Sequence, residues 1–339
     1  MDRKAVSFFS VGLAVGIILT VMLFSWLGRG SGQEEGAAGK VVLKLAHVLD
    51  QSHPVHLAME NMAEELDAVS GGLMELQIFP NGQLGSETDS IEQVQKGVLA
   101  MVKTSTAPLE GFIPDMALFG LPYLFRDSEH YWNVLLGDVG EELLAKGSGV
   151  GLKGLIYYDS GSRSFYTIDS PVLHPDDLRN KKIRVMRSKT SIEMISTMGG
   201  SPTPIPFGEL YTALQQGMVD GAENNPPSVD TSRHYEVAKH YSLDEHSRIP
   251  DIVLFSQKIW DDLTPQQQRW MQEAANRSVT FQRELWKVKT QESLDKLEAA
   301  GVTVYYPEKE PFREKVRPMY DALKGTSLYE LIERVEAVQ

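Results

Sequence analysis

The stretch that decides the fold is residues 41–79, VVLKLAHVLDQSHPVHLAMENMAEELDAVSGGLMELQIF. Its first eight residues are rich in β-branched and aliphatic side chains, which predicts a strand over 41–48. Apolar residues near helical spacing predict a helix over 56–69, and the glycines at 71 and 72 end it. Residues 73–79 then predict a second strand. This strand–helix–strand order predicts mostly parallel strands covered by helices, which is an α/β fold.

The same order of elements continues outward and then starts again in the middle of the chain. Ser86 and Asp89 form a capping pair for a helix that runs through Lys96. Prolines 202, 204 and 206 predict a rigid loop. Further strands are predicted over 99–102, 155–158, 164–168, 182–186, 219–222 and 251–256, and further helices over 191–198 and 207–217. Two such blocks predict two similar lobes rather than an array of short repeats.

A long helix is predicted over 265–300. Thr264 is suited to the N-cap, Pro265 to the first helical position, and Gln267 completes a capping box, while Gly301 is the expected C-cap. At 1.5 Å per residue, such a helix reaches about 54 Å. That is more than one small lobe needs, so the helix is expected to bridge two lobes.

The N-terminus has the pattern of a targeting segment. Arg3 and Lys4 precede an apolar run over 8–27, and a Gly/Ser/Ala/Glu-rich spacer follows over 28–39. We therefore interpret residues 1–39 as a signal peptide or a retained membrane anchor with a spacer, and expect the rest to be periplasmic. The alternative is a buried helix at the N-terminus.

Composition excludes several classes of site. The 339-residue chain has no cysteine, which excludes disulfides, iron–sulfur clusters, thiolate zinc sites, cysteine nucleophiles and a lipid on an N-terminal cysteine. Its 33 Lys and Arg against 46 Asp and Glu give a net charge of −13. Such a surface repels phosphate backbones, so no nucleic-acid partner is expected. An anion site here needs concentrated local positive charge.

Two motifs have ordinary explanations. Gly149 to Gly154 matches G-x-G-x-x-G, but a helical stretch precedes it and a strand follows, which predicts a helix-to-strand turn instead of a dinucleotide site. His47, His53 and His56 cluster near the end of the first strand. A zinc site there lacks a carboxylate at a familiar spacing, so we expect capping, hydrogen-bonding or solute contacts and no metal.

Two arginines and one loop are candidates for binding an acid. Arg184 alternates with Ile183 and Val185, so its side chain points to the opposite face of the strand, and a guanidinium binds a carboxylate through two parallel hydrogen bonds. Arg163 precedes another predicted strand. The alternative for either is an exposed edge or an internal ion pair. The loop over 220–227, DGAENNPP, offers amides and a stiff exit, or is a plain turn.

The sequence resembles the solute-binding proteins of TRAP (tripartite ATP-independent periplasmic) transporters, of the dicarboxylate-receptor (DctP) type. The resemblance covers about residues 41–304 and rests on several segments in order: FPNGQLG at 79–85, QVQKG at 93–97, LPYLFR at 121–126, KIRV at 182–185, FGELYTALQ at 207–215 and VDGAEN at 219–224. No single segment is decisive, but together and in this order they are specific.

The resemblance implies two α/β lobes with parallel-rich sheets flanked by helices, crossing strands, and a long lobe-spanning helix near the C-terminus. Lobe I is expected over 40–160 and 250–288, and lobe II over 161–249 and 289–339, with the solute in the cleft between them. It implies that the solute carboxylate meets Arg184, Arg163 and Asn224, and that Phe207 packs against the solute. Such pairing agrees with physical expectation, because an unpaired buried charge costs several kcal/mol.

The segments around residues 53–56, 163–166 and 245–251 resemble the branch of the family that takes sugar acids. Hydroxyls of such a solute need side chains that donate and accept. The residues in suitable loops are His47, His56, Glu87, Lys103, Glu223, Glu245 and His246. A C4-dicarboxylate, the alternative solute, needs a second basic cluster that the sequence does not show clearly.

The function predicted from the resemblance is a receptor that delivers an organic acid, most specifically a uronate, to a TRAP permease, without catalysis and without a cofactor. An exported enzyme is the first alternative, with Glu223 and Glu245 as an acid–base pair. A sensor ectodomain is the second, if the N-terminal segment stays in the membrane, although no signalling domain follows.

Overall fold

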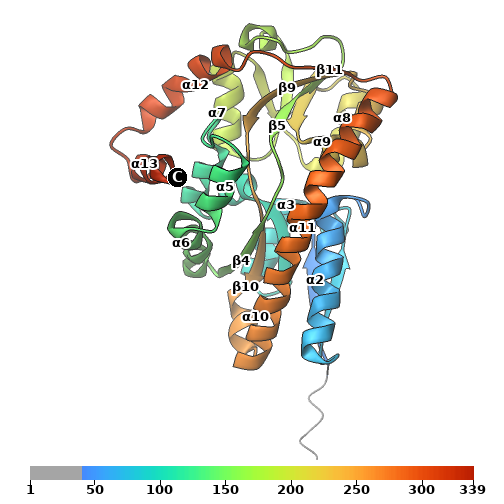
Figure 1. Ribbon diagram of the computed structural model, residues 1–339, viewed down its shortest axis with the longest axis vertical. Coiled ribbons are helices and arrows are strands. Elements are labelled where there is room, and N and C mark those ends of the chain that lie inside the picture. The colour runs from blue at the N-terminus through green and yellow to red at the C-terminus, as the bar shows by residue number, and fades with distance from the viewer. Residues whose placement is uncertain (1–39) are drawn as a thin grey trace, which may run out of the picture. The chain divides into compact units, whose positions relative to one another are not determined.

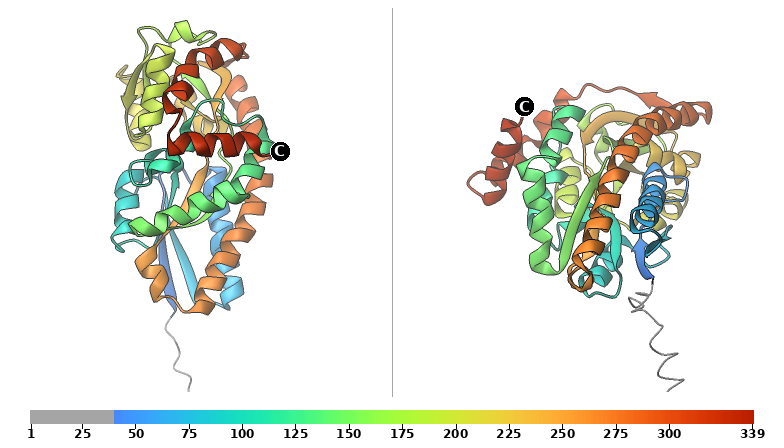
Figure 2. Two further views of the ribbon diagram at one scale, coloured as in Figure 1. Left: turned by 90° about the vertical axis from the view of Figure 1, so that its left-hand side faces the viewer. Right: turned by 60° about the horizontal axis from the view of Figure 1, so that its bottom comes forward.

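The structure is a computed structural model that describes residues 40–339, so the predicted export segment over 1–39 lies outside the described residues. Residues 41–339 form two lobes, each built on one mixed sheet (Figure 1). Within this described part, no helix has the length and apolar character needed to cross a membrane. The chain passes between the lobes several times, as the two turned views show (Figure 2).

Lobe I contains a five-stranded sheet in the order β2-β1-β3-β10-β4. The first three strands in the chain are parallel, whereas β10 lies antiparallel between β3 and β4. Its strands are β1 (Val41–Ala46), β2 (Met74–Phe79), β3 (Met101–Ser105), β4 (Leu152–Tyr158) and β10 (Asp251–Ser256). Its helices are α2 (Pro54–Ser70), α3 (Glu87–Gln95), α4 (Thr106–Leu109), η1 (Pro114–Gly120), α5 (Ser128–Leu135), α6 (Asp138–Lys146), η2 (Gly147–Val150) and α10 (Gln257–Asp262).

Lobe II contains a six-stranded sheet in the order β11-β9-β5-β8-β6-β7. β5 is antiparallel to both of its neighbours, and β6 is parallel to both of its own. Its strands are β5 (Arg163–Thr167), β6 (Lys182–Val185), β7 (Ser201–Pro204), β8 (Gly221–Asn224), β9 (His240–Ser247) and β11 (Thr303–Tyr305). Its helices are η3 (Pro175–Leu178), α7 (Lys189–Met198), η4 (Phe207–Glu209), α8 (Leu210–Gln215), α9 (Pro226–Thr231), η5 (His234–Glu236) and α12 (Glu310–Leu323).

Both faces of the lobe I sheet are covered, as the alternation along β10 shows. Ile252 and Leu254 belong to the apolar cluster under α3, α5 and α6, while Val253 and Phe255 belong to the cluster under α2 and α11 (Pro265–Ala299). A strand buried on both faces is a continuous apolar run, and this is why the sequence predicts β10 at its observed bounds.

Helix α11 runs alongside both lobes (Figure 1). Its first half packs Met271 and Ala274 into the lobe I core, and Leu297 near its end packs into the lobe II core. The predicted capping box of Thr264 and Gln267 is confirmed. The helix ends one residue earlier than expected, with Ala300 as C-cap and Gly301 in the left-handed region at φ 82°. The helix therefore spans the two lobes, as predicted.

The C-terminal helix corrects the predicted division of lobes, which assigned 289–339 to lobe II. Leu331, Ile332 and Val335 of α13 (Ser327–Ala337) lie in the lobe I core. Arg126 and His130 of lobe I bind backbone carbonyls of its last residues. The end of α11, β11 and α12, which packs against α7, do lie on lobe II. The chain thus returns to lobe I at its end.

Other predictions also differ from the structure. The proline-rich segment expected to be a loop contains the edge strand β7, a place where missing backbone donors are tolerated. The strands expected at 99–102 and 219–222 are β3 and β8, each starting two residues later. The helix expected over 207–217 is divided into η4 and α8. The turn predicted at the glycine-rich motif is confirmed, since η2 precedes β4 and Gly151 has φ 79°.

Candidate functional site

The candidate site is a cavity between the lobes, at the place where strand ends from both sheets meet. Ligands of open α/β sheets bind at the carboxyl ends of strands, and β1, β3, β4, β6 and β8 all end here. The side chains that line the cavity are mainly polar: His53, Glu87, Lys103, Ser105, Ser160, Arg163, Arg184, Phe207, Asn224, Asn225, Ser228 and Asp251, with Val48, Leu49 and Met186. Both lobes therefore contribute to one binding surface.

Arg184 is a buried cation without a carboxylate partner among the described residues. Ile183 and Val185 on either side of it pack into the lobe II core, so the alternation predicted for this strand holds. Arg184 is 1% exposed, its Nε donates to the Ile205 carbonyl at 2.8 Å, and its guanidinium lies 5.7 Å from the Phe207 ring centroid. Its Nη1 has no hydrogen-bond partner, and burial lowers the pKa of Arg184. A buried donor of this kind is costly unless an acceptor arrives.

Arg163, the first residue of β5, has its partners within the protein. Its Nε and Nη2 lie 2.5 Å and 3.0 Å from the two carboxylate oxygens of Glu223. Its Nη1 donates to Asn224 Oδ1 at 2.8 Å. That oxygen also accepts the Asn225 N–H, so the Asn224 Nδ2 is the group left to donate into the cavity. Arg163 thus holds an internal carboxylate and orients an amide.

A charge network continues behind Arg163. Burial alone would raise the pKa of Glu223, but the Arg163 charge and the His246 contact lower that pKa to about 2. His246 Nδ1 lies 2.9 Å from Asp244 Oδ2, and its Nε2 lies 3.6 Å from Glu223 Oε2. Burial alone would lower the pKa of His246, yet the two carboxylates raise it to about 9. The ring is therefore an imidazolium at neutral pH.

A second buried ion pair lies on the lobe I wall. Lys103 Nζ is 2.7 Å from Asp251 Oδ2, and both side chains are less than a tenth exposed. Burial raises the pKa of Asp251 to about 6, with Lys103 opposing that rise. Glu87 begins α3 and accepts hydrogen bonds from Thr104 Oγ1 and the Ser105 N–H, so its carboxylate is held at the cavity edge.

The three histidines satisfy one another and the backbone. His47 Nδ1 accepts the Leu49 N–H and its Nε2 is 2.9 Å from His56 Nδ1, while His56 Nε2 is 3.2 Å from Glu60. Burial lowers the pKa of His47 to about 2, and burial likewise lowers that of His53. Residues 40–339 hold no group of three or more potential metal ligands.

Two contacts join the lobes beside the cavity. His53 Nε2 of lobe I is 3.1 Å from Ser228 Oγ of α9. The Glu110 carboxylate of lobe I accepts hydrogen bonds from Ser188 Oγ and from the N–H groups of Lys189 and Thr190 at the start of α7. A carboxylate at a helix N-terminus is favourably placed. These contacts indicate that the lobes are closed over the cavity.

The structure brings six of the predicted site residues to the cavity wall: Arg163, Arg184, Asn224, Phe207, Glu87 and Lys103. Glu223 and His246 lie behind Arg163, and His47 and His56 pair with each other outside the lining. Glu245 lies elsewhere, with φ 48° and an ion pair to Lys309. It lines a different cavity.

Sequence reasoning missed Asp251, Ser105, Ser160, Asn225 and Ser228, and it noted His53 without placing it at the site. Asp251 carried a usable signal, because it is a lone charge at the start of an apolar strand. The serines carried none.

Solved structures of similar proteins share this two-lobed fold. The family model described as bacterial extracellular solute-binding protein, family 7 (DctP), matches residues 45–326. A TRAP periplasmic solute-binding protein from Xanthobacter autotrophicus Py2, solved with bound β-D-galacturonate, is 42% identical with a TM-score of 0.85, over 88% of this chain and 100% of that one.

Two other relatives differ in their solutes. A TRAP periplasmic solute-binding protein from Roseobacter denitrificans, solved with bound β-D-glucuronate, is 36% identical with a TM-score of 0.85, over 88% of this chain and 100% of that one. The C4-dicarboxylate-binding periplasmic protein of Rhodobacter capsulatus is 28% identical over 305 residues, which are 88% of this chain and 91% of that protein.

Proposed function

Because this chain belongs to family 7 of the bacterial extracellular solute-binding proteins, we propose that it is a receptor for a uronate or a closely related sugar acid. The solute binds in the cavity between the lobes and is delivered to the membrane permease of a TRAP transporter. The proteins of this family are receptors, and we propose that this chain catalyses no reaction.

One observation carries the proposal: Arg184 Nη1 is buried at the cavity without an acceptor. A solute carboxylate would supply the acceptor and the opposite charge together. Asn224 Nδ2, oriented by Arg163, is the proposed second donor to the same carboxylate, and the Phe207 ring beneath Arg184 packs against the solute. A carboxylate bound in this way is fully hydrogen-bonded, which a buried charge requires.

The charges of the cavity favour one carboxylate on the solute instead of two. Arg163 is neutralised by Glu223 and Lys103 by Asp251, which leaves Arg184 as the lining cation without an ion-pair partner in the described residues. A C4-dicarboxylate would place its second charge near Asp251 or Glu87, where like charges repel. A sugar acid presents hydroxyls there, and these donate to carboxylates and accept from Lys103.

The solved relatives support the same solute class. The protein from Xanthobacter autotrophicus holds galacturonate and the one from Roseobacter denitrificans holds glucuronate, at higher identity than the C4-dicarboxylate-binding relative. We also propose that residues 1–39 direct export, as a cleaved signal or a retained anchor, and that the receptor acts in the periplasm.

Calorimetric titration of the purified protein with galacturonate, glucuronate and succinate tests the proposal, after unfolding and refolding to remove any retained solute. We expect tight one-to-one binding of at least one uronate and weak or no binding of succinate. Thermal unfolding gives a second readout, because a ligand at 100 times its Kd adds about 2.7 kcal/mol to the folded state. Tight succinate binding without uronate binding would overturn the solute class and leave the receptor function standing.

A further inference from the structure

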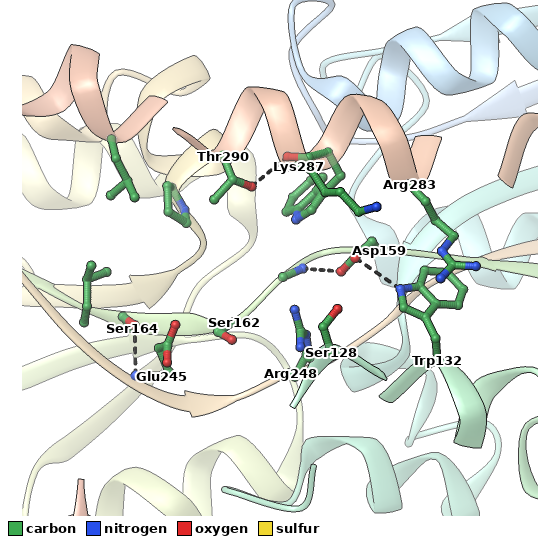
Figure 3. A pocket seen from close by; sticks show the side chains of 15 residues that line it. Ser128, Trp132, Asp159, Ser162, Ser164, Glu245, Arg248, Arg283, Lys287 and Thr290 are labelled. Atoms are coloured by element: carbon green, nitrogen blue, oxygen red, sulfur yellow. Dashed lines mark hydrogen bonds between the residues drawn. The ribbon is translucent and has the colours of Figure 1, made fainter. Parts of the chain in front are cut away.

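A second cavity lies on the other side of the crossing strands. Its volume is about 360 Å³, and helix α11, the crossing segments and both lobes line it (Figure 3). Different residues of one crossing segment line the two cavities: Ser160 and Arg163 line the solute cavity, whereas Asp159, Gly161 and Ser162 line this one. We call it the hinge cavity.

The hinge cavity gathers three basic side chains, Arg248, Arg283 and Lys287. Arg248 Nε is buried without a hydrogen-bond partner, and its guanidinium lies 5.0 Å from the Tyr131 ring centroid. Arg283 lies 4.1 Å from the Trp132 ring centroid. Each guanidinium group lies with its face over an aromatic ring. The N–H groups along its edge can therefore donate hydrogen bonds to a planar acceptor.

The two carboxylates that line this cavity already have partners within the protein. Asp159 accepts the Gly161 N–H with one carboxylate oxygen and the Trp132 indole N–H with the other, as Figure 3 shows. Glu245 forms an ion pair with Lys309. Lys287 pairs with Glu284, which leaves Arg248 and Arg283 as the lining cations without an ion-pair partner in the described residues. In an acidic protein, two such arginines, one with an unsatisfied donor, are an electrostatic focus for an anion.

We propose that the hinge cavity binds a small oxyanion, a carboxylate or a phosphate, between Arg248 and Arg283. The indole rings of Trp132 and Trp286 in the lining suit the carbon skeleton of an organic anion. This anion site is distinct from the solute site, because none of the residues that line one cavity lines the other.

Occupancy of this site couples to lobe closure. The crossing strands separate the two cavities, so lobes that open on the solute side approach each other on the hinge side. An anion that fills the hinge cavity in the closed arrangement therefore opposes opening. By linkage, the anion tightens solute binding by the same factor by which the solute tightens anion binding. This coupling, but not the site itself, rests on the proposed function.

Calorimetry on the full chain with Arg184→Ala tests the site without interference from the solute cavity, with sodium phosphate and sodium benzoate as probes. We expect saturable binding of at least one probe. Phosphate alone would identify an inorganic or phosphorylated ligand, and benzoate alone a carboxylate with a ring or apolar face. Absence of saturable binding by both probes would overturn the proposal.

Variants then locate the binding. Arg248→Gln and Arg283→Gln are each expected to weaken probe affinity at least tenfold. Lys289→Gln, at a partly exposed lysine of α11 that pairs with Glu292, should leave probe affinity unchanged. If Arg248→Gln fails to fold, the probe affinities of Arg283→Gln and Lys287→Gln still test the site. Equal affinity in Arg283→Gln and Lys289→Gln would contradict the site. Uronate affinity of the native chain that is unaffected by saturating probe would contradict the coupling.

Discussion

Two buried arginines lie on either side of β8 in the same sheet, and they differ in what surrounds them. Arg163 on β5 meets a bidentate carboxylate and an amide oxygen within the protein, while Arg184 on β6 meets one backbone carbonyl and a ring. Burial opposes the charge of both, yet the pKa of Arg163 is raised by Glu223 and that of Arg184 is lowered. Residue type and burial are the same for both arginines, so the missing partner of Arg184 is what makes it the proposed carboxylate-binding residue.

The largest effect is expected when Arg163 is replaced. Replacing Arg163 with Met removes the bidentate partner of the buried Glu223 and leaves it only the 3.6 Å contact with His246. We therefore expect a loss of about 3–5 kcal/mol in the free energy of unfolding, measured by denaturant titration. The double variant Arg163→Met with Glu223→Leu should recover most of that loss, because both charges are then gone. A double variant as unstable as the single one would contradict the structural role of the pair.

Replacing Arg184 with Ala should lower the affinity for the solute and leave stability intact. We expect uronate affinity to fall by about 2–5 kcal/mol, which is roughly 30-fold to several thousandfold, since the bound carboxylate loses its buried partner. Stability of the solute-free protein should be unchanged or higher, because an uncompensated buried cation is removed. The matched control is Arg179→Ala, an exposed arginine of the same lobe that pairs with Asp176. Loss of stability without loss of affinity would reverse the two roles.

The network behind Arg163 predicts a pH dependence of stability. The pKa of His246 is about 9 in the folded protein, against an ordinary value near 6.5. The stabilisation is therefore fully present below pH 6.5 and is lost as the pH rises through 9, by up to about 3 kcal/mol. Denaturant titrations between pH 6 and pH 10 measure it, and His246→Gln should flatten the profile. An equal slope in that variant would exclude His246 as the cause.

The smallest effect concerns selectivity at Lys103. Asp251→Asn keeps the side-chain shape but frees the charge of Lys103, so the cavity gains a second uncompensated cation. We expect the ratio of succinate to uronate affinity to rise about tenfold, or about 1.4 kcal/mol, in competition calorimetry. Lys258→Met is a control on the exposed face of lobe I. An unchanged ratio would mean that Asp251 does not set the preference for one carboxylate.

Local signals in the sequence predicted much of the fold. Capping residues at Ser86 and Thr264 correctly predicted where two helices begin, and the apolar run over 251–256 correctly predicted a strand. Helix α9 was missed because its two leading prolines suggested a stiff loop, although proline suits the first helical turn. The strand β9 was missed because its sequence HYSLDEHS is mostly polar and is buried only through long-range pairing.

The placement of Arg184 was predictable because one strand carries the information. Alternation predicted that its side chain lies opposite the core, which the structure confirms, and the resemblance to a family suggested the role proposed for it. The pairing of Lys103 with Asp251 was not predictable, since it joins residues about 150 positions apart through β3 and β10. The return of α13 to lobe I was hidden for the same reason, because a helix pattern shows an apolar face but not the sheet that receives it.

We propose that the solute carboxylate binds Arg184 while Arg163 keeps its internal partner. A crystal structure of this protein with galacturonate tests it most directly. We expect the carboxylate within hydrogen-bond distance of Arg184 Nη1 and Asn224 Nδ2, with the bidentate contact between Arg163 and Glu223 intact. A carboxylate that displaces Glu223 from Arg163 and leaves Arg184 Nη1 without an acceptor would contradict it.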